Sequence, residues 1–177
     1  MRDKWIATYS RSESPDRFQL IKGQLLRPLP APALFDFDGT AAELESFNFL
    51  ANDVSLPVVG PRAMEVLQQH ASGDYQALAA IVRTIDGVKS SEFTLLNLTH
   101  EVKALDHDRS VVEYIEGTSA ILGFRKLVYR DDALGPYHLA RDAEYHGHIL
   151  VSDDLVERLR AIDINGAVFL TPDAIKL

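Results

Sequence analysis

Cysteine is absent from this chain of 177 residues. Neither a disulfide framework nor a Cys-ligated zinc or iron–sulfur site can therefore form within it, and nothing points to an oxidising compartment. Long apolar runs are also missing, since the longest, residues 77–82, falls far short of the roughly 20 residues that cross a bilayer. The first twelve residues lack the apolar core of a secretion signal. We therefore expect a cytoplasmic protein that has no membrane as a partner.

Basic residues are the minority charge. The 18 Lys and Arg are outnumbered by 26 Asp and Glu, which gives a formal net charge of −8. A surface of this sign repels nucleic acid and steers a basic protein partner towards itself. The alternative is that the acids only keep the protein in solution. Between Arg27 and Arg62 there is no basic residue, whereas this stretch contains Asp36, Asp38, Glu43, Glu45 and Asp53.

Common catalytic motifs are missing as well. The sequence has no Walker loop, no G-x-G-x-x-G and no G-x-S-x-G. His146 and His148 could place two imidazoles together as metal ligands, but no third ligand is indicated, and we interpret them as part of a turn beside a strand. Apart from one segment, the sequence therefore predicts no catalytic residue, no metal and no cofactor.

That segment is LFDFDGT, residues 34–40. It resembles the first motif of the haloacid-dehalogenase superfamily, in which the first Asp attacks phosphorus and the second serves as acid and base. Asp36 and Asp38 would then be the catalytic residues of a small phosphatase. The alternative is a strand whose alternation places Phe35 and Phe37 in a core and both aspartates on the wet face.

A phosphatase of this kind also needs a later Ser or Thr, a lysine and an acidic pair that holds magnesium. The best candidates are Thr99, Lys126 and the pair Asp131 and Asp132. Lys126 and Asp131 would lie on opposite faces of one extended segment, which is the wrong geometry. We therefore prefer the strand interpretation.

Hydrophobic periodicity predicts an α+β fold, with a mixed or antiparallel sheet and a few helices. Helices are expected from Pro61, over residues 74–87, and from Ser152, which is suited to capping. Strands are expected at residues 5–9, 18–21, 34–40, 47–50, 93–98, 121–129, 137–139, 149–151 and 167–170.

Two segments of the chain resemble each other. Residues 56–68 and 148–160 each read as strand, cap and helix, at an offset of 92 residues. They suggest an N-terminal α+β half, residues 1–90, and a C-terminal β-rich half with one capped helix, residues 91–177. Two unrelated amphipathic helices in one compact domain would give the same pattern, so both alternatives stay open.

From Thr94 onward the sequence is similar to a known family. The matching segments are LLNLTHEVKALDHDRS, ILGFRKLVYRDDALG, YHLAR and HILVSDDLVERLRAIDINGAVFLTPD. They resemble the eleventh immunity-protein family of bacterial polymorphic-toxin systems, in which Leu105, Asp106 and Ser110 match a turn and a Val-Ser-Asp-x-Leu helix precedes Gly-x-x-Phe. The resemblance covers residues 94–173, and LFDFDGT is not part of it.

The resemblance implies an antitoxin without catalytic residues, which binds a toxin delivered by a contact-dependent system such as type VI secretion and blocks it. A nuclease toxin would carry a basic cleft that carboxylates can occlude. Ordinary surface acids are the alternative. We expect the toxin to contact Asp36, Asp38, Glu43 and Glu45 first and Asp153, Asp154 and Glu157 second, with Phe35, Phe37, Phe47 or Tyr75 as aromatic anchors.

The purified protein tests the phosphatase alternative directly. We expect no magnesium-dependent hydrolysis of generic phosphomonoesters, because a binding protein makes and breaks no bond in its partner. A colorimetric phosphatase assay measures this. Hydrolysis that is lost in Asp36→Asn would contradict the immunity assignment.

Overall fold

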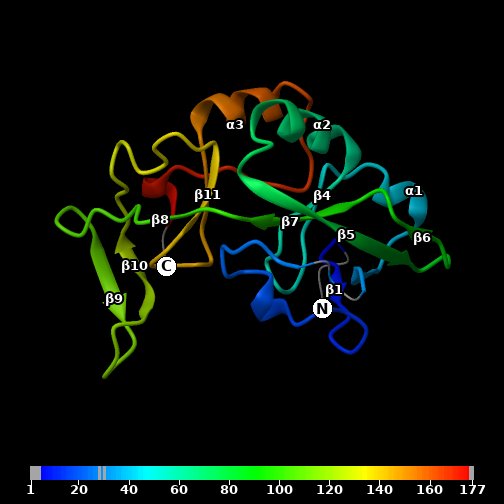
Figure 1. The fold of residues 1–177 in the computed structure, drawn as a ribbon, viewed down its shortest axis with the longest axis horizontal. Helices are drawn as coiled ribbons and strands as arrows, with labels where there is room; N and C mark the ends of the chain where they lie inside the picture. The colour runs from blue at the N-terminus through cyan, green and yellow to red at the C-terminus, as the bar shows by residue number, and fades with distance from the viewer. Residues whose placement is uncertain (1–4, 28, 30, 176–177) are drawn as a thin grey trace.

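The computed structural model describes residues 5–27, 29 and 31–175. Within this part of the chain the fold is α+β, as predicted, with a mixed sheet and three short α-helices along one side of it (Figure 1). The largest sheet of the described residues has seven strands in the order β1-β2-β5-β7-β4-β3, with β6 paired to β5. These strands are β1 (Thr8–Tyr9), β2 (Ala33–Phe37), β3 (Phe49–Leu50), β4 (Val58–Val59), β5 (Tyr75–Thr84), β6 (Lys89–Ser90) and β7 (Thr94–Leu98).

Strand β2 contains most of the LFDFDGT segment and lies inside this sheet. It pairs antiparallel with β1 and parallel with β5, in a register that places Asp36 opposite Arg83. Its burial alternates: Ala33, Phe35 and Phe37 are buried, and the residues between them are partly exposed. The predicted period-two strand is therefore confirmed.

The helix predicted over residues 74–87 is wrong, because residues 75–84 form strand β5. The apolar stripe fits a helix, but the buried side chains of β5 are Leu78, Ala80, Val82 and Thr84, which alternate as in a strand. Both edges of β5 are paired, with β2 on one side and β7 on the other. Ile85, which the helix would have buried, is 67% exposed. Pairing with distant strands thus overrides a local pattern that alanine makes ambiguous.

Two smaller sheets follow along the chain. Strands β9 (Val111–Tyr114) and β10 (Ile121–Lys126) form a hairpin that projects from the body of the molecule (Figure 1). Strand β11 (Leu139–Asp142) lies between β12 (Ile149–Val151) and β8 (Glu101–Val102). The strand expected at 137–139 therefore begins two residues later, and the one expected at 121–129 ends at Lys126.

Two further predicted strands are wrong. The first, at residues 18–21, is replaced by a short 3-10 helix, Arg17–Gln19, which Asp16 caps. The second, at residues 167–170, is irregular backbone, in which Val168 is 81% exposed. A short 3-10 helix, Pro172–Ala174, follows it.

The helices are α1 (Ala41–Leu44), α2 (Pro61–His70) and α3 (Asp153–Arg160). Helix α3 starts as predicted, because the Ser152 hydroxyl accepts a hydrogen bond from the Leu155 N–H. Helices α2 and α3 pack together and bury Leu67 and Leu159 in one cluster against the sheet. The two similar segments therefore do form the same unit of strand, cap and helix. No helix among the described residues is long and apolar enough to cross a membrane.

The predicted border near residue 90 falls between β6 and β7. Strand β7 pairs with β5 over five residue pairs, so the sheet itself is continuous across this border. A division into residues 1–90 and 91–177 stays a prediction.

Asp74 ties the start of β5 to β11. Its side chain is buried, and its Oδ2 accepts hydrogen bonds from the backbone N–H groups of His138, at 2.7 Å, and Leu139, at 2.9 Å. The sequence pattern predicted Asp74 at the start of a helix. It instead supplies the acceptor that two buried amides need.

We expect Asp74→Ala to lower the free energy of unfolding by about 3 kcal/mol, because two N–H groups lose a charged acceptor. Urea denaturation followed by circular dichroism measures this. Asp132→Ala is the control, since this side chain is exposed, and it should change the free energy by less than about 0.5 kcal/mol. Equal effects of the two substitutions would contradict the role of Asp74.

Candidate functional site

Asp36 lies on the partly exposed face of β2, but its carboxylate is already bound. Arg83 donates to both oxygens, from Nε to Oδ1 at 2.7 Å and from Nη2 to Oδ2 at 2.9 Å. Glu13 also pairs with Arg83, at 2.9 Å. Hydrogen bonds from the guanidinium, to Asp36 first and then to Glu13, raise the pKa of Arg83. The Asp36 carboxylate is thus part of a three-residue ion cluster.

Asp38 and Glu45 are the exposed acids among the four predicted in this region. Asp38 follows β2 and is exposed, and Glu45 ends α1 and is exposed. Glu43 differs, because its carboxylate accepts the Thr40 N–H at 2.9 Å and completes a capping box at the start of α1. Two of these four predicted acids therefore also have structural roles.

Asp86 joins this region although sequence analysis missed it. Its carboxylate accepts a hydrogen bond from the Thr84 hydroxyl and lies 3.2 Å from the Ala41 N–H. These two contacts, the hydroxyl first, lower the pKa of Asp86. The β5–β6 turn is thereby fixed against the start of α1.

The second predicted group lies on α3. Asp154 forms a bidentate pair with Arg158, with both N···O distances at 2.9 Å, and Arg158 lowers the pKa of Asp154. Asp153 and Glu157 are exposed on the same helix. This group lies on the same side of the sheet as α1 and α2 (Figure 1).

The aromatic residues predicted as anchors divide into two classes. Phe35 is 0% exposed and Phe37 is 1% exposed, so the prediction that a partner contacts them is wrong, since both are core residues. Tyr75 and Phe47 are partly buried. Phe47 lines a groove, which makes it the better candidate for contact with a partner.

The groove has a volume of about 440 Å³ and lies between α1, the start of α2 and residues 88–93. Its lining includes the apolar side chains of Leu44, Phe47 and Phe93. Four charged residues also line it: Glu45, Arg62, Lys89 and Glu92. Among the predicted acids, Glu45 therefore belongs to a hollow surface that carries charges of both signs.

Residues 165 and 166 brace one wall of the groove from the far end of the sequence. The Asn165 carbonyl accepts hydrogen bonds from the N–H groups of Asn48, at 3.1 Å, and Phe49, at 3.0 Å. Gly166 has φ of +87°, and a Cβ there would lie 1.8 Å from the Phe49 carbonyl oxygen. Only glycine fits this contact.

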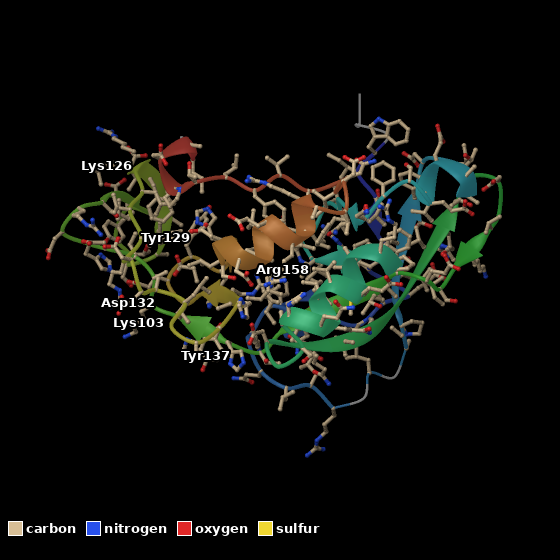
Figure 2. All side chains as sticks on the ribbon, turned by 90° about the horizontal axis from the view of Figure 1, so that it is seen from above. Lys103, Lys126, Tyr129, Asp132, Tyr137 and Arg158 are labelled. Atoms are coloured by element: carbon tan, nitrogen blue, oxygen red, sulfur yellow. The ribbon has the colours of Figure 1, made fainter. Side chains whose placement is uncertain are left out.

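The arrangement does not assemble the phosphatase parts. Lys126 and Asp132 lie at the end of the molecule opposite to α1, the helix that directly follows LFDFDGT (Figure 2). Asp36 is held by Arg83 instead of facing an open pocket. The described residues contain no group of three or more His, Asp or Glu that could hold a metal ion.

Three groove residues were not predicted from the sequence: Asn48, Arg62 and Lys89. The sequence contains one local sign of the groove wall. The pair Gly60 and Pro61 predicts that a helix starts there without a side-chain cap. The other lining residues come together only through the sheet.

No curated protein matches this chain. The model of the immunity protein family (Imm11) matches residues 6–172. This match is longer than the resemblance found at residues 94–173, and it includes LFDFDGT, which sequence analysis had left outside the family pattern. The segment is thus one strand and turn of the family domain, and the chain belongs to the immunity protein family (Imm11).

Proposed function

We propose that this protein neutralises a cognate bacterial toxin by binding it in the cytoplasm, and that it covers the active site of the toxin without catalysing a reaction. Membership of the immunity protein family over residues 6–172 is the observation that carries the proposal. The proposal extends to the toxin: a secreted nuclease delivered by type VI secretion. This part rests on the charge of the chain and on its family.

The charge of the chain favours a basic partner. At −8, the protein steers a positively charged domain towards itself, and a secreted nuclease has such a surface around its active site. Asp38, Glu45, Asp153 and Glu157 are exposed, whereas Asp36, Glu43 and Asp154 are exposed in part or hold structural contacts. We therefore propose the first four as the leading toxin-facing carboxylates and the other three as supporting residues.

Co-expression tests the proposal. The toxin domain encoded in the same locus is expressed in bacteria with and without this chain, and growth and co-purification are measured. We expect the toxin alone to stop growth and the pair to restore it, with both proteins in one complex. Continued growth arrest in the presence of excess immunity protein would refute the proposal.

A further inference from the structure

The turn between β5 and β6 presents two large apolar side chains to solvent. Ile85 is 67% exposed and Val88 is 44% exposed. The turn itself is held in place, because the Asp86 carboxylate accepts a hydrogen bond from the Ala41 N–H at 3.2 Å. The Ile85 N–H also donates to the Gly39 carbonyl at 3.1 Å. Both apolar side chains therefore stand on a fixed support, and a partner that covers them loses little conformational entropy in ordering the turn.

Trp5 adds an aromatic ring to the same surface. The ring packs on Phe37, at a centroid distance of 6.2 Å, and on Phe47, at 5.6 Å, and the residue is still 37% exposed. Phe47 lines the groove together with Val88, which belongs to the same turn as Ile85. The exposed apolar residues are therefore grouped around one groove instead of scattered, as is typical of surfaces that bind another protein.

Carboxylates outnumber cations around this groove. Neither Asp38 nor Glu45 forms an ion pair with another described residue. The Arg62 guanidinium is bound to the Ile162 carbonyl, at 2.8 Å. A basic partner complements the excess of negative charge. The exposed acids are Asp38, Glu45, Asp86 and Glu92, and the exposed basic residues are Arg62 and Lys89.

A second exposed apolar patch lies on the β9–β10 hairpin, where the charges are balanced. Tyr114 is 48% exposed and Leu122 is 59% exposed. Residues 103–132, which include this hairpin, contain five basic residues and six acids. The hairpin and α1 lie at opposite ends of the molecule (Figure 1). Of the two patches, the one beside α1 is therefore the one that complements a basic toxin.

We propose that the toxin docks on the surface beside α1, through a basic segment in which an apolar side chain lies between lysine or arginine residues. The apolar side chain enters the groove and packs on Phe47, while Trp5 and Ile85 cover it from the rim. The flanking cations of the toxin pair with Asp38 and Glu45. This inference rests on the proposed immunity function and names the surface and the anchors through which it acts. We call this surface the α1 face, and it consists of Trp5, Asp38, Glu45, Phe47, Ile85, Asp86 and Val88.

Titration calorimetry with the purified toxin domain tests the anchors. Ile85→Ser removes an exposed apolar side chain, and Trp5→Ala removes the ring. We expect the Kd to rise by about 10-fold for Ile85→Ser and by about 30-fold for Trp5→Ala, as for anchor residues at the centre of an interface. Leu122→Ser is the matched control, because it truncates a similarly exposed side chain on the hairpin. It should change the Kd by less than about 2-fold.

Thermal unfolding shows which variants are folded, and Ile85→Ser keeps the test valid if Trp5→Ala does not fold. Folded anchor variants that bind the toxin as tightly as the wild type would overturn the inference. A larger loss of affinity in Leu122→Ser than in Ile85→Ser would also overturn it, since the toxin would then dock on the hairpin. In both cases, rescue of growth by the wild type leaves the immunity function standing. A wild-type chain that fails to bind its toxin would overturn both.

A double-mutant cycle tests the basic character of the toxin segment. Each exposed Lys or Arg of the toxin domain is changed to Met, and its affinity is measured for the wild type and for a chain that combines Asp38→Asn with Glu45→Gln. We expect at least one cation whose replacement weakens binding to the wild type by about 5-fold more than binding to the doubly substituted chain. If no toxin cation couples to these two carboxylates, the assignment of the α1 face to a basic segment is wrong.

Discussion

Replacing Phe35 with alanine should lower the free energy of unfolding by about 4 kcal/mol, the range measured for aromatic residues in cores. Phe35 is 0% exposed and lies on an interior strand, with its ring edge against Tyr9 at a centroid distance of 5.3 Å. Truncation leaves a cavity in the core cluster on the buried face of the sheet, which the surrounding side chains fill only in part. Urea denaturation gives the change directly.

Phe18→Ala is the matched control, because the ring of Phe18 is 54% exposed. Its effect should stay within about 0.5 kcal/mol. The affinity of Phe35→Ala for the toxin shows whether Phe35 is a core residue or an interface residue. Below the unfolding temperature, Phe35→Ala should bind the toxin as the wild type does, whereas a true interface anchor would lose at least about 2 kcal/mol of binding free energy. A large loss of affinity in the folded variant would restore Phe35 as a contact residue.

Removing four exposed carboxylates should slow toxin association by about 10-fold at low salt, because electrostatic steering depends on their field. Each substitution keeps the shape of its side chain and removes one charge, so the four together change the net charge from −8 to about −4. Stopped-flow mixing at several salt concentrations measures the rate, and the difference should shrink as the salt rises. The variant combines Asp38→Asn, Glu45→Gln, Asp153→Asn and Glu157→Gln.

A second set of four substitutions distinguishes a local surface from total charge. It changes the net charge equally but uses exposed acids outside the three α-helices. We expect the second set to slow association by less than about 3-fold. Equal slowing by the two sets would show that net charge alone attracts the toxin and that the proposed acids have no special place. The control combines Asp108→Asn, Glu116→Gln, Asp132→Asn and Asp173→Asn.

Helix α3 and strand β2 could be predicted from the sequence, because neighbouring residues in the chain specify them. Helix α3 follows from a capping serine, acids in its first turn and basic residues in its last turn, and all of these lie within ten residues. The alternation of Phe35 and Phe37 likewise predicted β2 correctly. Strand β5 could not be predicted in this way, because its state depends on β2 and β7, which pair with it from elsewhere in the chain.

The candidate site shows the same limit. Asp36 was predicted to lie on the wet face of a strand and to face the toxin, and no basic residue lies near it in sequence, yet the parallel register of β2 and β5 brings Arg83 opposite to it. The prediction missed this pair because residues 74–87 were expected to form a helix. Seven acids were predicted to face a toxin. The sequence shows that each carries a negative charge, but only the fold shows which of these carboxylates are held by helix capping or by ion pairs.

The contact between Asn165 and the groove wall has a consequence for biosynthesis. Asn165 also donates from Nδ2 to the Ser46 carbonyl at 3.2 Å, across a sequence separation of 119 residues. Contacts between such distant residues form slowly, because closing the intervening chain costs entropy before any bond is gained. The wall therefore cannot be completed on the ribosome until residue 166 has been translated and has left the exit tunnel. The groove wall is thus among the last parts of the molecule to complete its contacts during synthesis.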